Sequence, residues 1–187
     1  MPKRSLSDRS FSDRLLAAGL LAGCFAAAAK ARVLLTVEEA LALAFPDARV
    51  ERTTVFLTVA QRAEVERLAG SALDSAIVHP YRATNAGSLV GTAYFDVHLV
   101  RTLPETLMVV VDTEGRVARV EVLSFDEPPD YRPRAEWYGQ FRSRPLDDEL
   151  ALRRSIRPVT GASLTASATT LAVRRALALH RVLQVRQ

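Results

Sequence analysis

Hydroxyl side chains crowd the start of a helix near the C-terminus, where one of them would be enough to cap it. Residues 158–177 read PVTGASLTASATTLAVRRAL, with Thr160, Ser163 and Thr165 grouped around Gly161. Gly161 permits a tight turn, and the helix start behind it offers free N–H groups and the positive end of the helix dipole, which hold phosphate well. This pattern suggests a phosphate cradle that is not a P-loop, since no Gly-Lys-Ser/Thr follows. The alternative is a helix N-cap with surplus hydroxyls.

The elements that must position this stretch are predicted to form an α+β fold, an antiparallel sheet with packed helices. Alternating and β-branched residues predict strands over 49–58, 75–83 with an interruption at Pro80, 88–100, 105–111 and 116–125. Helices are predicted over 36–45, 58–68, 146–155 and 164–183. Capping boxes, Thr36 with Glu39 and Thr58 with Gln61, open the first two helices, and Gly70 is expected to stop the second.

The hydroxyl-rich stretch resembles the flavinylation motif of the FMN-binding domain family, Ser/Thr-Gly-Ala-Ser/Thr-x-Ser/Thr. That family includes the FMN-carrying subunits of the Rnf and sodium-translocating NADH:quinone reductase complexes. The resemblance implies covalent FMN, linked by a flavin transferase through its phosphate to the last hydroxyl residue, Thr165. The earlier places of the motif are filled, in order, by Thr160, Gly161, Ala162, Ser163 and Leu164.

The resemblance extends upstream and covers roughly residues 88–180. Residues 109–129, VVVDTEGRVARVEVLSFDEPP, resemble the family's strand–turn–strand segment, and Glu127 takes the place of its loop glutamate among the implied cofactor-binding residues. Two positions depart from the family pattern. Arg157 stands where many relatives carry aspartate, which bears on recognition by the transferase. The loop reads EPPDY where relatives often have Glu-Thr-Pro-Gly, which bears on non-covalent flavin contacts.

The N-terminus has the layout of an export signal, with a polar, basic stretch over 1–14 before an apolar stretch over 15–29. LAGC, ending at Cys24, resembles a lipoprotein box, and AKA, ending at Ala31, resembles an ordinary cleavage site. The mature chain is therefore expected to start at residue 24 or 32, on the periplasmic side. It would be lipid-anchored through Cys24, or else secreted or periplasmic after cleavage near Ala31. A buried N-terminal helix is the structural alternative.

Charge and cysteine content exclude several classes of function. The formal net charge is +4, and residues 1–23 carry +2 of it, from Lys3, Arg4, Arg9 and Arg14 against Asp8 and Asp13. The remaining +2 is too little for the clustered basic face of a nucleic-acid-binding protein, so no nucleic-acid partner is expected. The single cysteine excludes an intrachain disulfide and a cysteine-based metal cluster.

Two further groups could do chemistry. Asp96 and His98 point to the same face of a predicted strand, where they would line a flavin or substrate site or form a half-buried histidine with a local carboxylate. A hydrolase triad of these two with Ser163 is disfavoured, because the Gly-x-Ser-x-Gly elbow is missing. Trp137, Tyr138 and Phe141 would stack on an isoalloxazine ring or pack in the core.

These patterns predict a leader over 1–31, an N-terminal α/β extension over 32–85 and an FMN-binding domain over 86–187. The favoured function is an exported electron-transfer flavoprotein that exchanges electrons with a membrane-bound redox protein. A small reductase acting alone on a soluble substrate is less favoured. The alternative from another class is a non-redox binding or scaffold module with the same fold and no covalent flavin.

Overall fold

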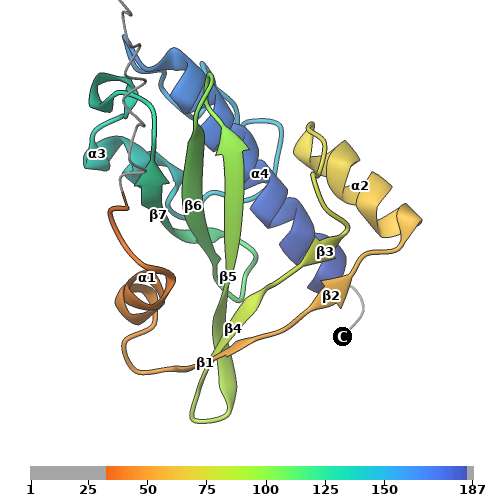
Figure 1. Ribbon diagram of the computed structural model, residues 1–187. Coiled ribbons are helices and arrows are strands. Elements are labelled where there is room, and N and C mark those ends of the chain that lie inside the picture. The colour runs from red at the N-terminus through yellow and green to blue at the C-terminus, as the bar shows by residue number, and fades with distance from the viewer. Residues whose placement is uncertain (1–32, 185–187) are drawn as a thin grey trace, which may run out of the picture.

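Five antiparallel strands form the main sheet of the protein, in the order β1-β4-β5-β6-β7 (Figure 1). The computed structural model describes residues 33–184, so the predicted leader over 1–31 lies outside the described residues. The strands of this sheet are β1 (Arg49–Arg52), β4 (Tyr81–Asn85), β5 (Ser88–Leu99), β6 (Pro104–Val111) and β7 (Val117–Phe125). A two-stranded sheet pairs β2 (Val55–Phe56) with β3 (Ile77–Val78).

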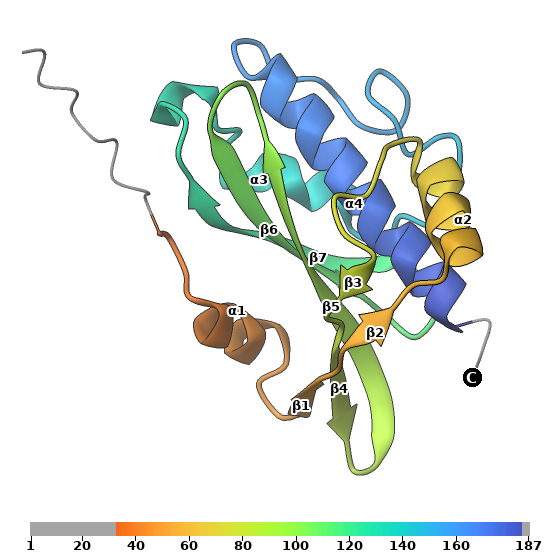
Figure 2. The same cartoon turned by 45° about the vertical axis from the view of Figure 1, so that its right-hand side comes forward.

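Helices cover both faces of the main sheet. The helices are α1 (Val37–Ala44), α2 (Val59–Ala69), α3 (Ala135–Tyr138) and α4 (Ser163–Gln184), and two short 3-10 turns are η1 (Pro129–Tyr131) and η2 (Gly139–Phe141). The long α4 crosses one face beside α2, and α1 lies on the other face (Figure 2). The chain is thus an α+β protein, as the sequence predicted, and segment 32–85 supplies β1 and β4 to the same sheet.

The packing of β6 explains why residues 107–111 of this strand form an unbroken apolar run. Val109 and Val111 join a core with Val173 and Leu177 of α4, while Met108 and Val110 join a second core, with α1, on the opposite face. Because successive strand residues point to opposite faces, a strand segment packed between two helical layers is apolar on both faces, as residues 107–111 are.

Most of the predicted starts and ends of helices and strands were confirmed. Both capping boxes form, Gly70 ends α2 in the left-handed conformation at φ 72°, and Pro80 separates β3 from β4. The predicted strand over 49–58 forms two strands, because β1 pairs with β4 and β2 pairs with β3. Between them the Thr53 N–H donates to the Pro80 carbonyl (2.9 Å).

The helix predicted over 146–155 is wrong. These residues form turns with one isolated bridge, between Leu152 and Ile156. The Asp147 carboxylate accepts the Leu150 N–H (2.9 Å), and Arg153 has φ 64°, which no α-helix accommodates. Asp side chains that capture nearby backbone N–H groups in this way compete with helix formation.

No helix within residues 33–184 is long and apolar enough to cross a membrane.

Candidate functional site

The hydroxyl-rich stretch forms a tight turn that leads into α4. Gly161 has φ 84°, and no atom lies within 4 Å of the place a Cβ would take there. The left-handed backbone conformation therefore explains why a glycine stands at this position, and a clash between a larger side chain and its neighbours does not. The Ala162 N–H donates to the Val159 carbonyl (3.2 Å) to close the turn. Ser163 then begins the helix, and its hydroxyl also donates to the Val159 carbonyl (3.3 Å).

Thr165 has its hydroxyl turned inward, where η1 covers it. Only 1% of the residue is exposed, and its Oγ1 donates to the Tyr131 carbonyl oxygen (2.5 Å). Its neighbours differ. Leu164 is 57% exposed and Ala162 is buried, while Thr160 and Ser163 are both exposed. The motif is thus gathered at one place, with its last hydroxyl closed off by a segment 34 positions earlier in the chain.

A cavity of about 210 Å³ lies beside Thr165. Residues 161–165 form one wall, Tyr131 contributes from η1, and Val100 and Arg101 contribute from the turn between β5 and β6. The first turn of α4 provides N–H groups and the positive end of a 22-residue helix, and Arg101 adds a cation. The donors fit a phosphate. Cavities for whole drug-sized ligands span about 300–1,000 Å³, so this one is the size for the phosphate end of a nucleotide only.

Comparison with known protein families decides what kind of domain this is. A family model described as the FMN-binding domain matches residues 103–178, from the turn before β6 to most of α4. Residues 103–178 are an FMN-binding domain. The match includes Glu127 and the whole stretch 160–165, and it falls inside the predicted range 86–187. A search of curated proteins finds no match.

Glu127 of the FMN-binding domain holds the turn that lines the cavity. Its Oε1 accepts the backbone N–H groups of Thr102 (2.7 Å) and Leu103 (2.9 Å) and the Thr102 hydroxyl (3.2 Å). These backbone donors lower the pKa of the Glu127 carboxyl from its usual value. Glu127 is not among the residues lining the cavity. The structure therefore places it behind the site, where it orders residues 100–103.

Replacing Glu127 with alanine is expected to loosen the turn between β5 and β6 without unfolding the domain. The amide hydrogens of Thr102 and Leu103 lose their acceptor and should exchange with solvent roughly tenfold faster. Hydrogen exchange followed by mass spectrometry checks this, with Glu114→Ala as the control, because Glu114 lies in the exposed turn between β6 and β7. Unchanged exchange at residues 102–103 would contradict the assigned role.

The aromatic residues that follow η1 pack in the core, as one of the two interpretations held. Trp137 lies edge-on to Tyr138 and to Phe141, with ring centroids 5.2 and 5.4 Å apart. Phe141 is fully buried. The Trp137 indole N–H donates to the Arg157 carbonyl (2.7 Å), and the Arg157 N–H donates to the Gln140 side chain (2.9 Å). Arg157, the departure from the family pattern, thus anchors its backbone on this aromatic segment.

Asp96 and His98 belong to a buried polar network between the sheet and α4. The His98 ring contacts Asp96 through Nδ1 (2.9 Å) and Glu105 through Nε2 (3.0 Å). Arg175 makes two hydrogen bonds to Asp96 (2.7 and 2.8 Å). Glu105 also accepts from two hydroxyls, those of Thr169 (3.1 Å) and Tyr138 (3.3 Å). The interpretation of His98 as a strand histidine with a local carboxylate is confirmed, and Glu105 and Arg175 are partners the sequence did not reveal.

The charges in this network balance. Burial alone would lower the pKa of His98, but its hydrogen bonds to Asp96 and Glu105 outweigh burial and raise that pKa. Burial likewise opposes ionisation of Asp96, but hydrogen bonds to His98 and Arg175 bring its pKa down to about 2. With His98 protonated, two cations face two carboxylates and the net charge is zero. Thr169 lies four residues after Thr165 on α4, so the network fixes the helix turn next to the motif.

Proposed function

We propose that this protein is an exported flavoprotein that carries FMN on Thr165 through a phosphoester bond. The observation that carries the proposal is the position of Thr165, which lies in the first turn of α4, beside a cavity with phosphate-binding donors, within an FMN-binding domain. The other motif residues each have a local part. Gly161 makes the turn, and Ser163 and Leu164 supply the first helical N–H groups.

Attachment requires the hydroxyl of Thr165 to leave its present partner. The Oγ1 proton is now donated to the Tyr131 carbonyl, and an esterified oxygen has no proton left to donate. η1 must therefore move away from α4 when the ester forms, and the Tyr131 carbonyl must find another donor, such as water. The α4 N-terminus and Arg101 then offset the negative charge of the bound phosphate.

FMN would supply the redox chemistry, and the protein would supply attachment, position and electrostatics. We infer that the domain exchanges electrons with a membrane-bound redox protein on the periplasmic side. Two features support this inference. The N-terminus has the layout of an export signal, in which the stretch ending at Cys24 resembles a lipobox, and a covalent bond would keep a flavin from diffusing away outside the cytoplasm. Simple electron transfer needs no general acid or base, and we assign none.

An intact-mass measurement tests the attachment. The chain is co-expressed with a flavin transferase, and the natural protein is expected to gain the mass of FMN less one water. Thr165→Ala should show no gain, while Thr165→Ser should keep it, because serine retains the hydroxyl. Ser163→Ala is the matched control. Its hydroxyl is exposed, lies two residues earlier and is not the proposed acceptor, so the gain should persist.

The buried state of Thr165 favours a second candidate, the binding or scaffold module without covalent flavin. A folded natural chain that gains no mass beside an active transferase would support that candidate and overturn the phosphoester proposal. Turnover of a soluble acceptor by the flavinylated chain alone, without a protein partner, would instead indicate a stand-alone reductase.

A further inference from the structure

The outer edge of β7 is paired at both ends and open in between. At one end Val117 exchanges backbone hydrogen bonds with Ser143 (2.7 Å) and Arg144 (3.0 Å). At the other end the Leu123 carbonyl accepts the N–H of Leu34 (2.7 Å). Between these points, residues 118–122 have β6 as their only backbone partner within the described chain, 33–184. Five residues of a strand span about 17 Å.

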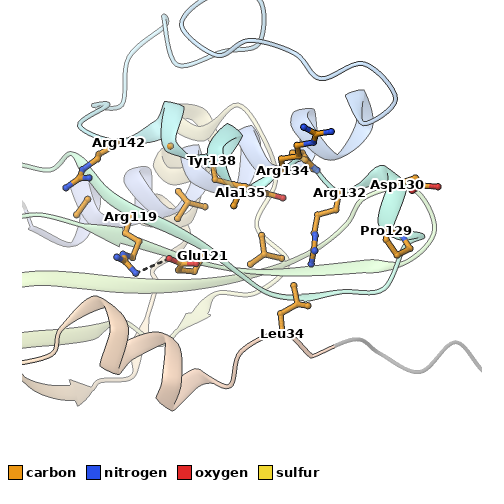
Figure 3. A pocket seen from close by; sticks show the side chains of 15 residues that line it. Leu34, Arg119, Glu121, Pro129, Asp130, Arg132, Arg134, Ala135, Tyr138 and Arg142 are labelled. Carbon is orange, nitrogen blue, oxygen red and sulfur yellow. Dashed lines mark hydrogen bonds and ion pairs between the residues drawn. The ribbon is translucent and has the colours of Figure 1, made fainter.

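A groove of about 900 Å³ follows this open edge (Figure 3). Residues 118–122 form its floor, and residues 129–142, with η1 and α3, form its upper wall. Arg132 reaches from that wall toward the strands, and Arg119 and Arg142 lie at the other end of the groove (Figure 3). The groove therefore combines an unpaired strand edge with a lining of guanidinium groups.

The arginines that line the groove outnumber its acidic residues. Arg119 is paired with Glu121 (3.0 Å), but neither Arg132 nor Arg142 has an ion pair with any residue in the described range 33–184. Asp130, the other acidic residue of the lining, points away from the groove in Figure 3. The groove thus carries surplus positive charge along an unpaired strand edge.

We propose that this groove binds an extended acidic segment of a partner protein, which adds to β7 as a further strand. Backbone groups of residues 118–122 would pair with the segment, and Arg132 and Arg142 would contact its carboxylates. The edge already accepts such pairing, since the segment around Leu34 bonds to Leu123 in this way. Peptide binding in this groove does not depend on flavin at Thr165. The docking proposal and the phosphoester proposal can therefore fail separately.

Fluorescence anisotropy with a labelled peptide tests the proposal on the full chain expressed without flavin transferase. The probe is the hexapeptide Thr-Asp-Val-Glu-Val-Asp, which combines negative charge with strand-forming residues. Reversing both charges, Arg132→Glu with Arg142→Glu, is expected to weaken binding at least about tenfold. Arg52→Glu is the matched control, because Arg52 is an exposed arginine on β1, the opposite edge of the sheet. The affinity of the Arg52→Glu variant for the peptide should stay within about twofold of that of the natural chain.

Two further measurements separate strand addition from simple charge attraction. Hydrogen exchange should show residues 118–122 protected when the peptide is bound, and a peptide with alternate backbone nitrogens methylated should bind far more weakly. Equal binding of the methylated peptide, equal binding by the doubly reversed chain, or no binding at all would each overturn the proposal. Displacement of the peptide by ATP, without protection of residues 118–122, would also overturn it and reassign the groove to small anions. The single variant Arg132→Gln serves if the double variant does not fold.

Discussion

Replacing Glu105 with leucine is expected to lower the free energy of unfolding by about 3–5 kcal/mol. Glu105 is fully buried, and its carboxylate accepts from the His98 ring and from the hydroxyls of Thr169 and Tyr138. Leucine would leave these three groups without their acceptor in the interior. A buried polar group without a partner costs its full desolvation penalty, and a buried charge costs more.

The size of this effect follows from the burial of the network, and a matched variant checks that cause. Glu121→Leu removes a carboxylate from the neighbouring strand, where Glu121 is paired with Arg119 at 3.0 Å but 30% of its side chain is exposed. Exposed pairs of this kind contribute less than about 1 kcal/mol. Urea unfolding of both variants and the natural chain gives the comparison. A loss at Glu105 no larger than that at Glu121 would show that the network does not stabilise the fold as described.

The sequence was most informative where the signals are local. A capping box lies within four residues, and the run of apolar residues in β6 reports burial on both faces, so the helix starts and the meander were predictable. The helix over 146–155 was not, because its composition suits a helix while the Asp147 side chain and the left-handed Arg153 hold it in turns. Residue types alone do not say which of these competing local interactions wins.

The position of the motif in the fold was predictable from the sequence, but the burial of its last hydroxyl was not. The spacing around Gly161 placed Thr165 in the first turn of a helix, as the structure has it. Burial of that hydroxyl depends on η1, and Asp96 meets Arg175 from 79 positions away. No periodicity in a single sequence encodes such pairings between distant elements, so Glu105 and Arg175 appeared only with the fold.

The protein is expected to lose stability as the pH rises above about 6.5, with a slope of at most about 1.4 kcal/mol per pH unit. The cause is His98, whose pKa in the folded protein is raised. Above about 6.5 the unfolded chain has released the His98 proton while the folded protein still holds it. The chain then takes up a proton when it folds. The free energy of unfolding therefore falls as the pH rises, until the pH passes the raised pKa of His98. Below about 6.5 this contribution is complete.

The groups around His98 set the sign of this effect. Asp96 from its own strand and Glu105 from β6 face its two nitrogens, and Arg175 and Thr169 from α4 and Tyr138 from α3 complete the surroundings. The two carboxylates dominate because they contact the ring directly. Asp96 titrates in a separate window, since its pKa of about 2 removes its contribution only as the pH falls below about 3.8.

His180 provides a control of opposite sign. It is buried beside Tyr94, and burial lowers its pKa. Its contribution is therefore complete above about 6.5 and is lost as the pH falls toward the lowered pKa. Urea unfolding across pH 5–9 separates the two residues. His98→Gln should flatten the decline above 6.5, and His180→Gln should leave that decline in place. An unchanged alkaline slope in His98→Gln would mean that His98 is not held protonated between Asp96 and Glu105. The charge balance assigned to the network would then be wrong.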